Sequence, residues 1–240
     1  MFPEADFVRF LAAFTRVATW TAVGPVVGDR TVPARVKLAV AGAVALMLMP
    51  LRSETQFSEL GLVLPREILF GIFIGAAGRM VMAAAETAGQ LIGLELGLGF
   101  AGIFDPMAGE QALPTRRLVL AFASLAFLGL GGLESAIWML SLPLEPALEG
   151  SLSVLISLAV ETLGAALRLV APLMIAAFIA NITMAVVSKA APALNPFSVM
   201  LALLLVVGLW MLLGLAPATI RELMTIARNA MEAPLRVMSP

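Results

Sequence analysis

Four glutamates that interrupt apolar stretches are the residues of this sequence best placed to do chemistry. They are Glu86, Glu95, Glu134 and Glu161. Ionisable residues in such stretches can form proton paths or face water-filled cavities. The sequence has no histidine and no cysteine, and no Glu–His or Asp–Arg constellation completes a relay. We therefore interpret the glutamates as groups that pair with partner subunits or face water. The sequence predicts no enzyme, no metal site and no cofactor.

A second candidate is a glycine-rich run over residues 89–106. Glycines four residues apart share one helix face, on which another backbone can approach closely. Further glycines weaken the helix, and an Asp-Pro pair then ends it. The candidate packing or hinge residues are Gly89, Gly93, Gly97, Gly99 and Gly102.

Bulky residues at the end of this run, Phe100, Ile103 and Phe104, would form an apolar loop tip. Two interpretations stay open on physical grounds. The run is either a packing face followed by a turn, or a hinged apolar plug, since hydrophobic constrictions can close a pore to water.

The elements that carry these residues are predicted to be membrane helices. The chain is 61% hydrophobic and only 13% charged, whereas soluble domains average about 25% charged residues. A soluble fold of 240 residues could not bury so much apolar surface. Nothing in the net charge of −1 indicates a nucleic-acid partner. The predicted fold is all-α, in one helical domain over residues 1–240.

A bilayer core is crossed by about 20 apolar residues in a helix. Two predicted segments are too long for one crossing and contain polar residues, so we expect each to be a broken hairpin. The predicted apolar helices span about 7–27, 36–51, 66–104 (broken hairpin), 117–144, 151–188 (broken hairpin) and 197–220, followed by an amphipathic tail over 221–240.

A short basic loop separates the first two predicted helices. Its motif contains Pro33, Arg35 and Lys37. Proline suits the first turn of the following helix. The positive charge predicts that this loop is cytoplasmic.

Three separated segments resemble the FliR family of flagellar type III export-gate proteins and its injectisome counterparts, such as SctT and SpaR. The first is Val32–Lys37, which enters an Ala/Leu-rich stretch that ends at Pro50. The second is Gly89–Pro106, with Leu-Gly-Phe-Ala at 98–101 and Phe-Asp-Pro at 104–106. The third is Ala191–Asn195, before Phe197.

The resemblance implies an architecture and a set of partners. The chain would behave as a P-type and a Q-type subunit joined end to end. It would assemble as a single copy with P-type (FliP-like) and Q-type (FliQ-like) subunits, with a FlhB-like subunit nearby. The assembly would lie in the bacterial inner membrane, in contact with lipid and within the flagellar basal body. Unfolded exported proteins would pass through it.

The resemblance also implies that the loop after the Leu-Gly-Phe-Ala motif plugs the resting channel. Carried onto this sequence, the plug covers residues 100–114. The expected plug and gate residues are Phe100, Ile103, Phe104, Asp105, Pro106 and Met107.

Two alternatives remain at this point. One is the same fold in a virulence injectisome. The other is a small secondary transporter, with broken helices that hold a substrate near the middle of the membrane.

Overall fold

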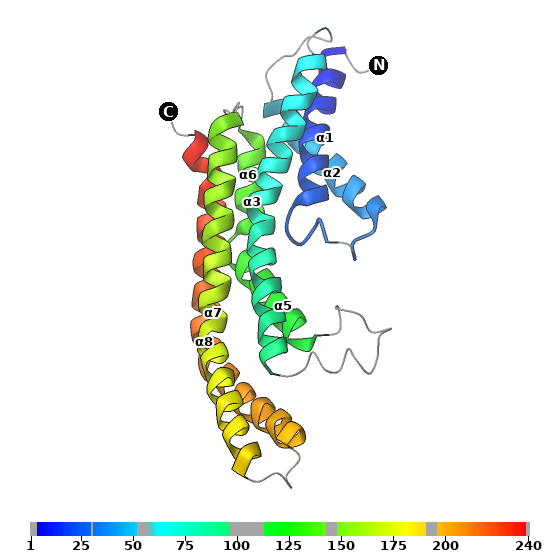
Figure 1. Cartoon of the computed structure of the whole chain (residues 1–240). Coiled ribbons are helices and arrows are strands. Elements are labelled where there is room, and N and C mark those ends of the chain that lie inside the picture. Colours follow the sequence, from blue (N-terminus) through cyan, green and yellow to red (C-terminus); the bar gives the residue numbers. More distant parts are fainter. Residues whose placement is uncertain are drawn as a thin grey trace. The chain divides into compact units, whose positions relative to one another are not determined.

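The computed structural model describes residues 4–29, 31–51, 58, 60–96, 113–142, 148–190 and 196–238. Over these ranges the chain is helical and contains no strand, which confirms the all-α prediction (Figure 1). The elements are α1 (Glu4–Val23), α2 (Ala34–Leu48), a 3-10 turn η1 (Met49–Leu51), α3 (Leu60–Glu95), α5 (Pro114–Gly129), α6 (Gly132–Ser141), α7 (Leu148–Ala190) and α8 (Pro196–Met238).

Prolines and one glycine mark where several helices begin and end. Pro33 precedes α2 in an extended conformation, and Pro114 and Pro196 are the first residues of α5 and α8. Proline suits the start of a helix because its missing N–H would have no partner there. Gly131 has a φ of +76°, a region that glycine enters without steric strain. It separates α5 from α6, whose axes differ by 55°.

Four helical segments among the described residues are long and apolar enough to cross a membrane. They are Ala34–Leu51, Leu60–Glu95, Leu152–Ala190 and Ala202–Leu235, and the bent pair α5–α6 is a fifth candidate. The predicted first span, 7–27, is helical as α1 up to Val23, but it is not among these candidates. Asp6, Arg9 and Arg16 make α1 too charged.

The long helices correct two boundary predictions. A break within 151–188 is wrong, because α7 is continuous over 43 residues despite Pro172. A break within the described part of 66–104 is also wrong, because α3 is continuous to Glu95. Polar residues that suggested breaks instead meet partners on other helices, as Glu86 does with Arg116 and Arg168 with Glu222. An internal proline is tolerated in such helices when the freed carbonyl finds another partner.

A third correction concerns the C-terminal segment. The predicted span 197–220 and tail 221–240 form the single helix α8, which continues to Met238. The predicted apolar face of the tail is buried, at Leu223, Ile226, Ala227 and Ala230. At 1.5 Å per residue, 43 helical residues extend about 65 Å, roughly twice the hydrocarbon thickness of a bilayer.

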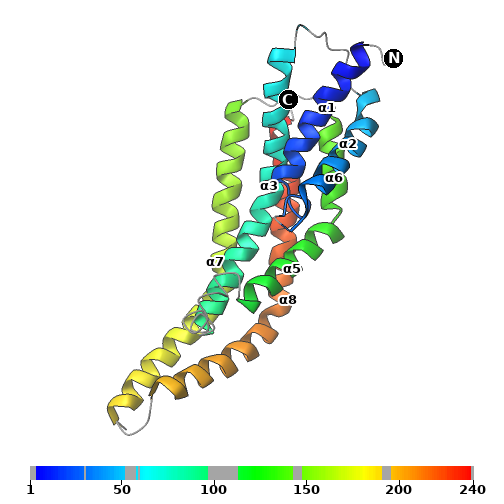
Figure 2. The ribbon, with the colours of Figure 1, turned by 90° about the vertical axis from the view of Figure 1, so that its right-hand side faces the viewer.

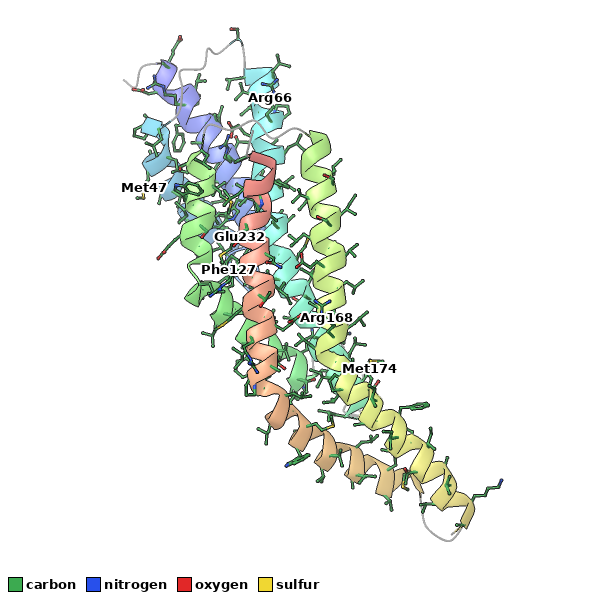
Figure 3. The ribbon with its side chains drawn as sticks, turned by 90° about the vertical axis from the view of Figure 1, so that its left-hand side faces the viewer. Met47, Arg66, Phe127, Arg168, Met174 and Glu232 are labelled. Atoms are coloured by element: carbon green, nitrogen blue, oxygen red, sulfur yellow. The ribbon has the colours of Figure 1, made fainter. Side chains whose placement is uncertain are left out.

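The chain packs as two compact units. Unit 1 contains residues 1–82, 124–161 and 226–240, and unit 2 contains residues 83–123 and 162–225. In unit 1, α1 lies against α2 and the first half of α3 (Figure 2). The core of unit 1 is built around Trp20, Phe70, Ile74, Met139 and Leu140. In unit 2, the parts of α7 and α8 that carry Arg168 and Glu222 lie side by side (Figure 3).

Candidate functional site: the helix junction that flanks residues 97–112

The candidate site is a junction in unit 2, where the end of α3 meets the start of α5. Two glycines of α3 make this contact possible. A Cβ on Gly89 would lie 2.6 Å from the Cα of Arg116, and a Cβ on Gly93 would lie 2.6 Å from Thr115 Oγ1. Because real Cβ atoms do not approach other atoms so closely, only glycine allows the two helices this separation. The structure thus places Gly89 and Gly93 on a packing face.

An ion pair lies across the same junction. The Nη2 of Arg116 donates to Glu86 Oε2 at 2.9 Å, and both side chains are about one-quarter exposed. An ion pair of this kind contributes less than about 1 kcal/mol to the free energy of unfolding in water, but it orients the two helices. One of the four glutamates considered for proton transfer is therefore paired within the chain.

Thr115 lies at the centre of the contact. Its side chain is buried, and its hydroxyl has no hydrogen-bond partner among the described residues. Thr115 follows Pro114 in the first turn of α5. The carbonyl of Leu113 accepts the N–H groups of Arg116 and Arg117, at 3.1 and 3.4 Å, so helical bonding begins immediately at this point.

Leu96, the residue that follows α3, lies in a pocket of unit 2. Its side chain is 1% exposed and lies among Leu173 and Ala177 of α7 and Leu204 of α8. Its Cδ2 atom occupies the space where a Cβ on Gly208 would lie, with a separation of only 1.8 Å. The end of α3 is therefore seated against the backbone of α8.

These contacts hold both residues that border 97–112, because Leu96 is buried on one side and Leu113 packs near Gly93 on the other. The junction fixes where that segment leaves and rejoins the helices. The segment itself is outside the described residues. It contains the expected hinges Gly97, Gly99 and Gly102 and the expected plug residues Phe100, Ile103, Phe104, Asp105, Pro106 and Met107.

The basic motif belongs to unit 1. The Lys37 ammonium donates to the Gly28 carbonyl at 2.9 Å, which ties α2 to the preceding turn. Arg35 is exposed. Asp29 Oδ1 accepts both the N–H and the hydroxyl of Thr31, each at 2.8 Å. These two hydrogen bonds, the backbone one first, hold the pKa of Asp29 below its usual value.

Unit 1 also contains a buried arginine, Arg16, whose partner was not predicted from the sequence. Arg16 of α1 donates through Nε and Nη2 to the carboxylate of Glu67 on α3. Its Nη1 donates to the carbonyls of Leu140 and Leu142, at 3.1 and 2.8 Å, at the C-terminal end of α6. The guanidinium carbon lies 4.2 Å from the ring centre of Phe70. Arg16 thus joins three helices.

A signal for this pair exists in the sequence, since an arginine flanked by apolar residues in a helix requires an acceptor. The identity of the acceptor depends on which helices are neighbours. Among the described residues, no group of three acidic side chains is placed to hold a metal ion.

Comparison with known proteins gives one consistent result. Residues 7–230 match the family described as bacterial export proteins, family 1. The flagellar biosynthetic protein FliR of Pectobacterium carotovorum subsp. carotovorum is 31% identical, over 86% of this chain and 83% of its own length. FliR of Escherichia coli K12 is 30% identical, over 84% and 82%. FliR of Aquifex aeolicus is 29% identical, over 88% and 86%.

Proposed function

Because the chain belongs to the FliR family of bacterial export proteins, we propose that it is a structural and gating component of a flagellar protein export channel. In this proposal a single copy assembles with P-type and Q-type subunits, beside a FlhB-like subunit, in the bacterial inner membrane. Unfolded flagellar proteins are the cargo.

The exposed apolar surface of the last two helices is the observation that carries the assembly proposal. Only 22% of the most apolar part of α7 and 6% of that of α8 is buried within the chain. Met47 of α2 and Met174 of α7 also point away from the other helices (Figure 3). Surface of this kind requires lipid or protein to cover it.

Helix length favours protein as part of that cover. Helices α7 and α8 each contain 43 residues, which is longer than the hydrocarbon core can accommodate without extreme tilt. The apolar surface beyond the bilayer then needs partner subunits. A channel that projects from the membrane plane supplies such a surface, whereas a monomeric transporter does not.

The junction at Gly89, Gly93 and Leu96 supports the gating part of the proposal. It provides a rigid base for residues 97–112, on which an apolar plug could close the channel and from which it could move aside. In this proposal the glycines that pack against α5 keep α3 and α5 in place when the channel opens.

Co-expression with P-type and Q-type partners tests this function. The tagged chain is extracted in mild detergent and the complex is measured by native mass spectrometry. We expect one assembly of defined mass with a single copy of this chain. A stable monomer or homodimer that ignores both partners would contradict the proposal and favour a self-sufficient transporter.

A further inference from the structure

The connection between α1 and α2 begins with a strained turn in unit 1. Val26 has a φ of +61°, and among the described residues it is the only one besides glycine with a positive φ. The N–H of Val27 donates to the carbonyl of Pro25 at 2.6 Å, which closes a three-residue turn around Val26. A γ-turn with a positive φ at its centre is rare and strained, and a branched side chain adds to the strain. The turn is therefore held in a conformation that its central residue disfavours.

A buried donor beside this turn is also unsatisfied. The side chain of Trp20 is 2% exposed, and its Nε1 has no hydrogen-bond partner in the part of the chain that the structure describes. The edge of the indole lies against the start of the turn, since a Cβ on Gly24 would lie 3.2 Å from Nε1. A buried N–H without a partner raises the free energy of the state that contains it. Two unfavourable features thus lie close together in the chain.

Contacts from α3 and α2 hold the turn in this state. Pro25 is buried, and its ring lies against Gly78 of α3, where a Cβ would be 2.7 Å from the proline Cγ and 2.8 Å from its Cδ. The Lys37 ammonium of α2 donates to the Gly28 carbonyl at 2.9 Å. Strained backbone persists only where the surrounding structure enforces it. We therefore expect the turn to relax when Pro25 leaves Gly78 and α2 leaves the turn.

Helix α2 is held by a small contact. Its fully buried residues are Ala41, Ala45 and Leu48, and only 17% of the candidate span Ala34–Leu51 is buried within the chain. In a membrane, apolar contact between helices contributes little, because lipid covers an apolar helix as well as another helix does. Strain at one residue changes an equilibrium constant by about tenfold. Strain at Val26 is therefore large enough to affect whether α2 stays in place.

We propose that the α1–α2 turn is a two-state hinge. In the state described above, α2 lies against α1, Val26 is strained and Pro25 lies on Gly78. In the second state Val26 has a negative φ, Pro25 has left Gly78, and α2 has moved away from α1. The strain favours the second state and so lowers the free energy that is needed to move α2. The proposal does not depend on the gating function, because it rests on contacts within unit 1.

Distances between spin labels measure the two states in the full chain. The sequence has no cysteine, so Phe7→Cys on α1 and Met47→Cys on α2, both at exposed positions, give one specific pair of labels. Double electron–electron resonance of the labelled chain in lipid nanodiscs is expected to give two distances. Val26→Gly should raise the ratio of docked to moved α2 by about fivefold, because glycine adopts a positive φ without strain.

Two further variants should change the ratio in the opposite direction. Gly78→Ala places a methyl group where the Pro25 ring lies, and Lys37→Met removes the hydrogen bond to Gly28. Both should increase the fraction of moved α2. Adding Val26→Gly to Lys37→Met should restore most of the docked fraction. Lys37→Met introduces no steric overlap, so it tests the hinge even if Gly78→Ala does not fold.

Val32→Gly is the matched control. Val32 belongs to the same connection and is half-buried, but its φ is not positive. This substitution should not raise the docked fraction. An increase as large as that of Val26→Gly would show that strain at Val26 does not set the ratio. A single distance, unchanged in every variant, would show that the second state does not form. Either result overturns the proposal.

The Trp20 indole gives an independent check that needs no labels. Its N–H resonance in an NMR spectrum is identified by its loss in Trp20→Phe. Exchange between the two states should broaden this resonance, because the indole lies against the turn. Val26→Gly should sharpen it, whereas Val32→Gly should not. A Trp20 resonance that is equally broad in both variants would contradict the hinge.

Discussion

Arg16 and Glu67 form an ion pair whose side chains are only 4% and 8% exposed, although the two residues are 51 positions apart in the chain. The arginine also caps the end of α6 through two carbonyls. All the surrounding groups are thus arranged for one positive charge. A charge that is held in this way keeps α1, α3 and α6 in a fixed register.

Removing either partner should therefore destabilise unit 1 strongly. Arg16→Leu or Glu67→Gln leaves a buried polar group without its partner, at an expected cost of about 3–5 kcal/mol in the free energy of unfolding. The double variant Arg16→Leu with Glu67→Leu should cost less than the sum of the two single changes. Reversible unfolding in mixed detergent measures each value, and strictly additive effects would show that the pair is not coupled.

Gly93→Ala should destabilise the α3–α5 junction by about 1–3 kcal/mol, because the added methyl overlaps Thr115. Combining it with Thr115→Ala should recover part of the loss by removing the hydroxyl. Gly42→Ala is the control, since nothing lies within 4 Å of a Cβ there. In a helix interior this control should stabilise by about 0.5–1 kcal/mol. Similar effects at both glycines would contradict close packing at Gly93.

Gly208→Ala should displace the Leu96 side chain and lower the free energy of unfolding, because a Cβ at position 208 would lie 1.8 Å from Leu96 Cδ2. Leu96→Ala alone should lower the free energy of unfolding by about 2–5 kcal/mol, because it leaves a cavity. The two changes together should cost less than their sum, since the alanine methyl enters the vacated space. Gly214→Ala on the same helix has open space around it and serves as the control. Thermal unfolding of the four variants provides the comparison.

Asp29 should make stability depend on pH in the acid range. Its pKa is lowered in the folded chain, so its contribution is fully present above the pKa of the unfolded chain, about 3.9, and is lost as the pH falls through the lower folded value. The difference in unfolding free energy between wild type and Asp29→Asn should therefore shrink below about pH 4. A difference that stays constant down to pH 2 would show that the two Thr31 hydrogen bonds do not favour the charged form.

Phe104→Ala, or deletion of residues 107–111, should raise ion leak through the assembled channel while leaving assembly intact. A smaller or shorter apolar tip blocks water less completely. Planar-bilayer conductance of the purified complex measures the leak. Phe7→Ala, at an exposed position of α1, should leave conductance unchanged. Wild-type conductance in both plug variants would remove the basis for a plug at this segment.

The helical class and the packing face of Gly89 and Gly93 could be predicted from the sequence, because both depend on local pattern. Four-residue glycine spacing defines one helix face whatever lies opposite, so Gly89 and Gly93 could be singled out before their neighbour was known. The sequence could not identify Thr115 and Arg116 as that neighbour. It also gave no reason to single out Gly208, whose role depends on Leu96, more than 100 residues earlier.

The predictions of helix boundaries were wrong where polar residues were taken to mark breaks in a helix. Arg168 suggested a turn because a charge is costly in an apolar helix, yet Glu222 of α8 accepts its hydrogen bonds and α7 continues. Glu86 is similar, with Arg116 as its partner. Whether an intramembrane charge ends a helix or pairs with a neighbour depends on tertiary contacts, which local pattern does not contain.

The long separation between Arg16 and its acceptors has a consequence for how the protein is made. At about 5–20 residues per second, Glu67 leaves the ribosome several seconds after Arg16, and Leu140 follows later still. Throughout that interval α1 carries a guanidinium with none of these acceptors, so it must wait beside water or the insertion machinery. Helix α1 is therefore synthesised before the groups that bind its guanidinium, and it can take its final place in unit 1 only after α3 and α6 have followed.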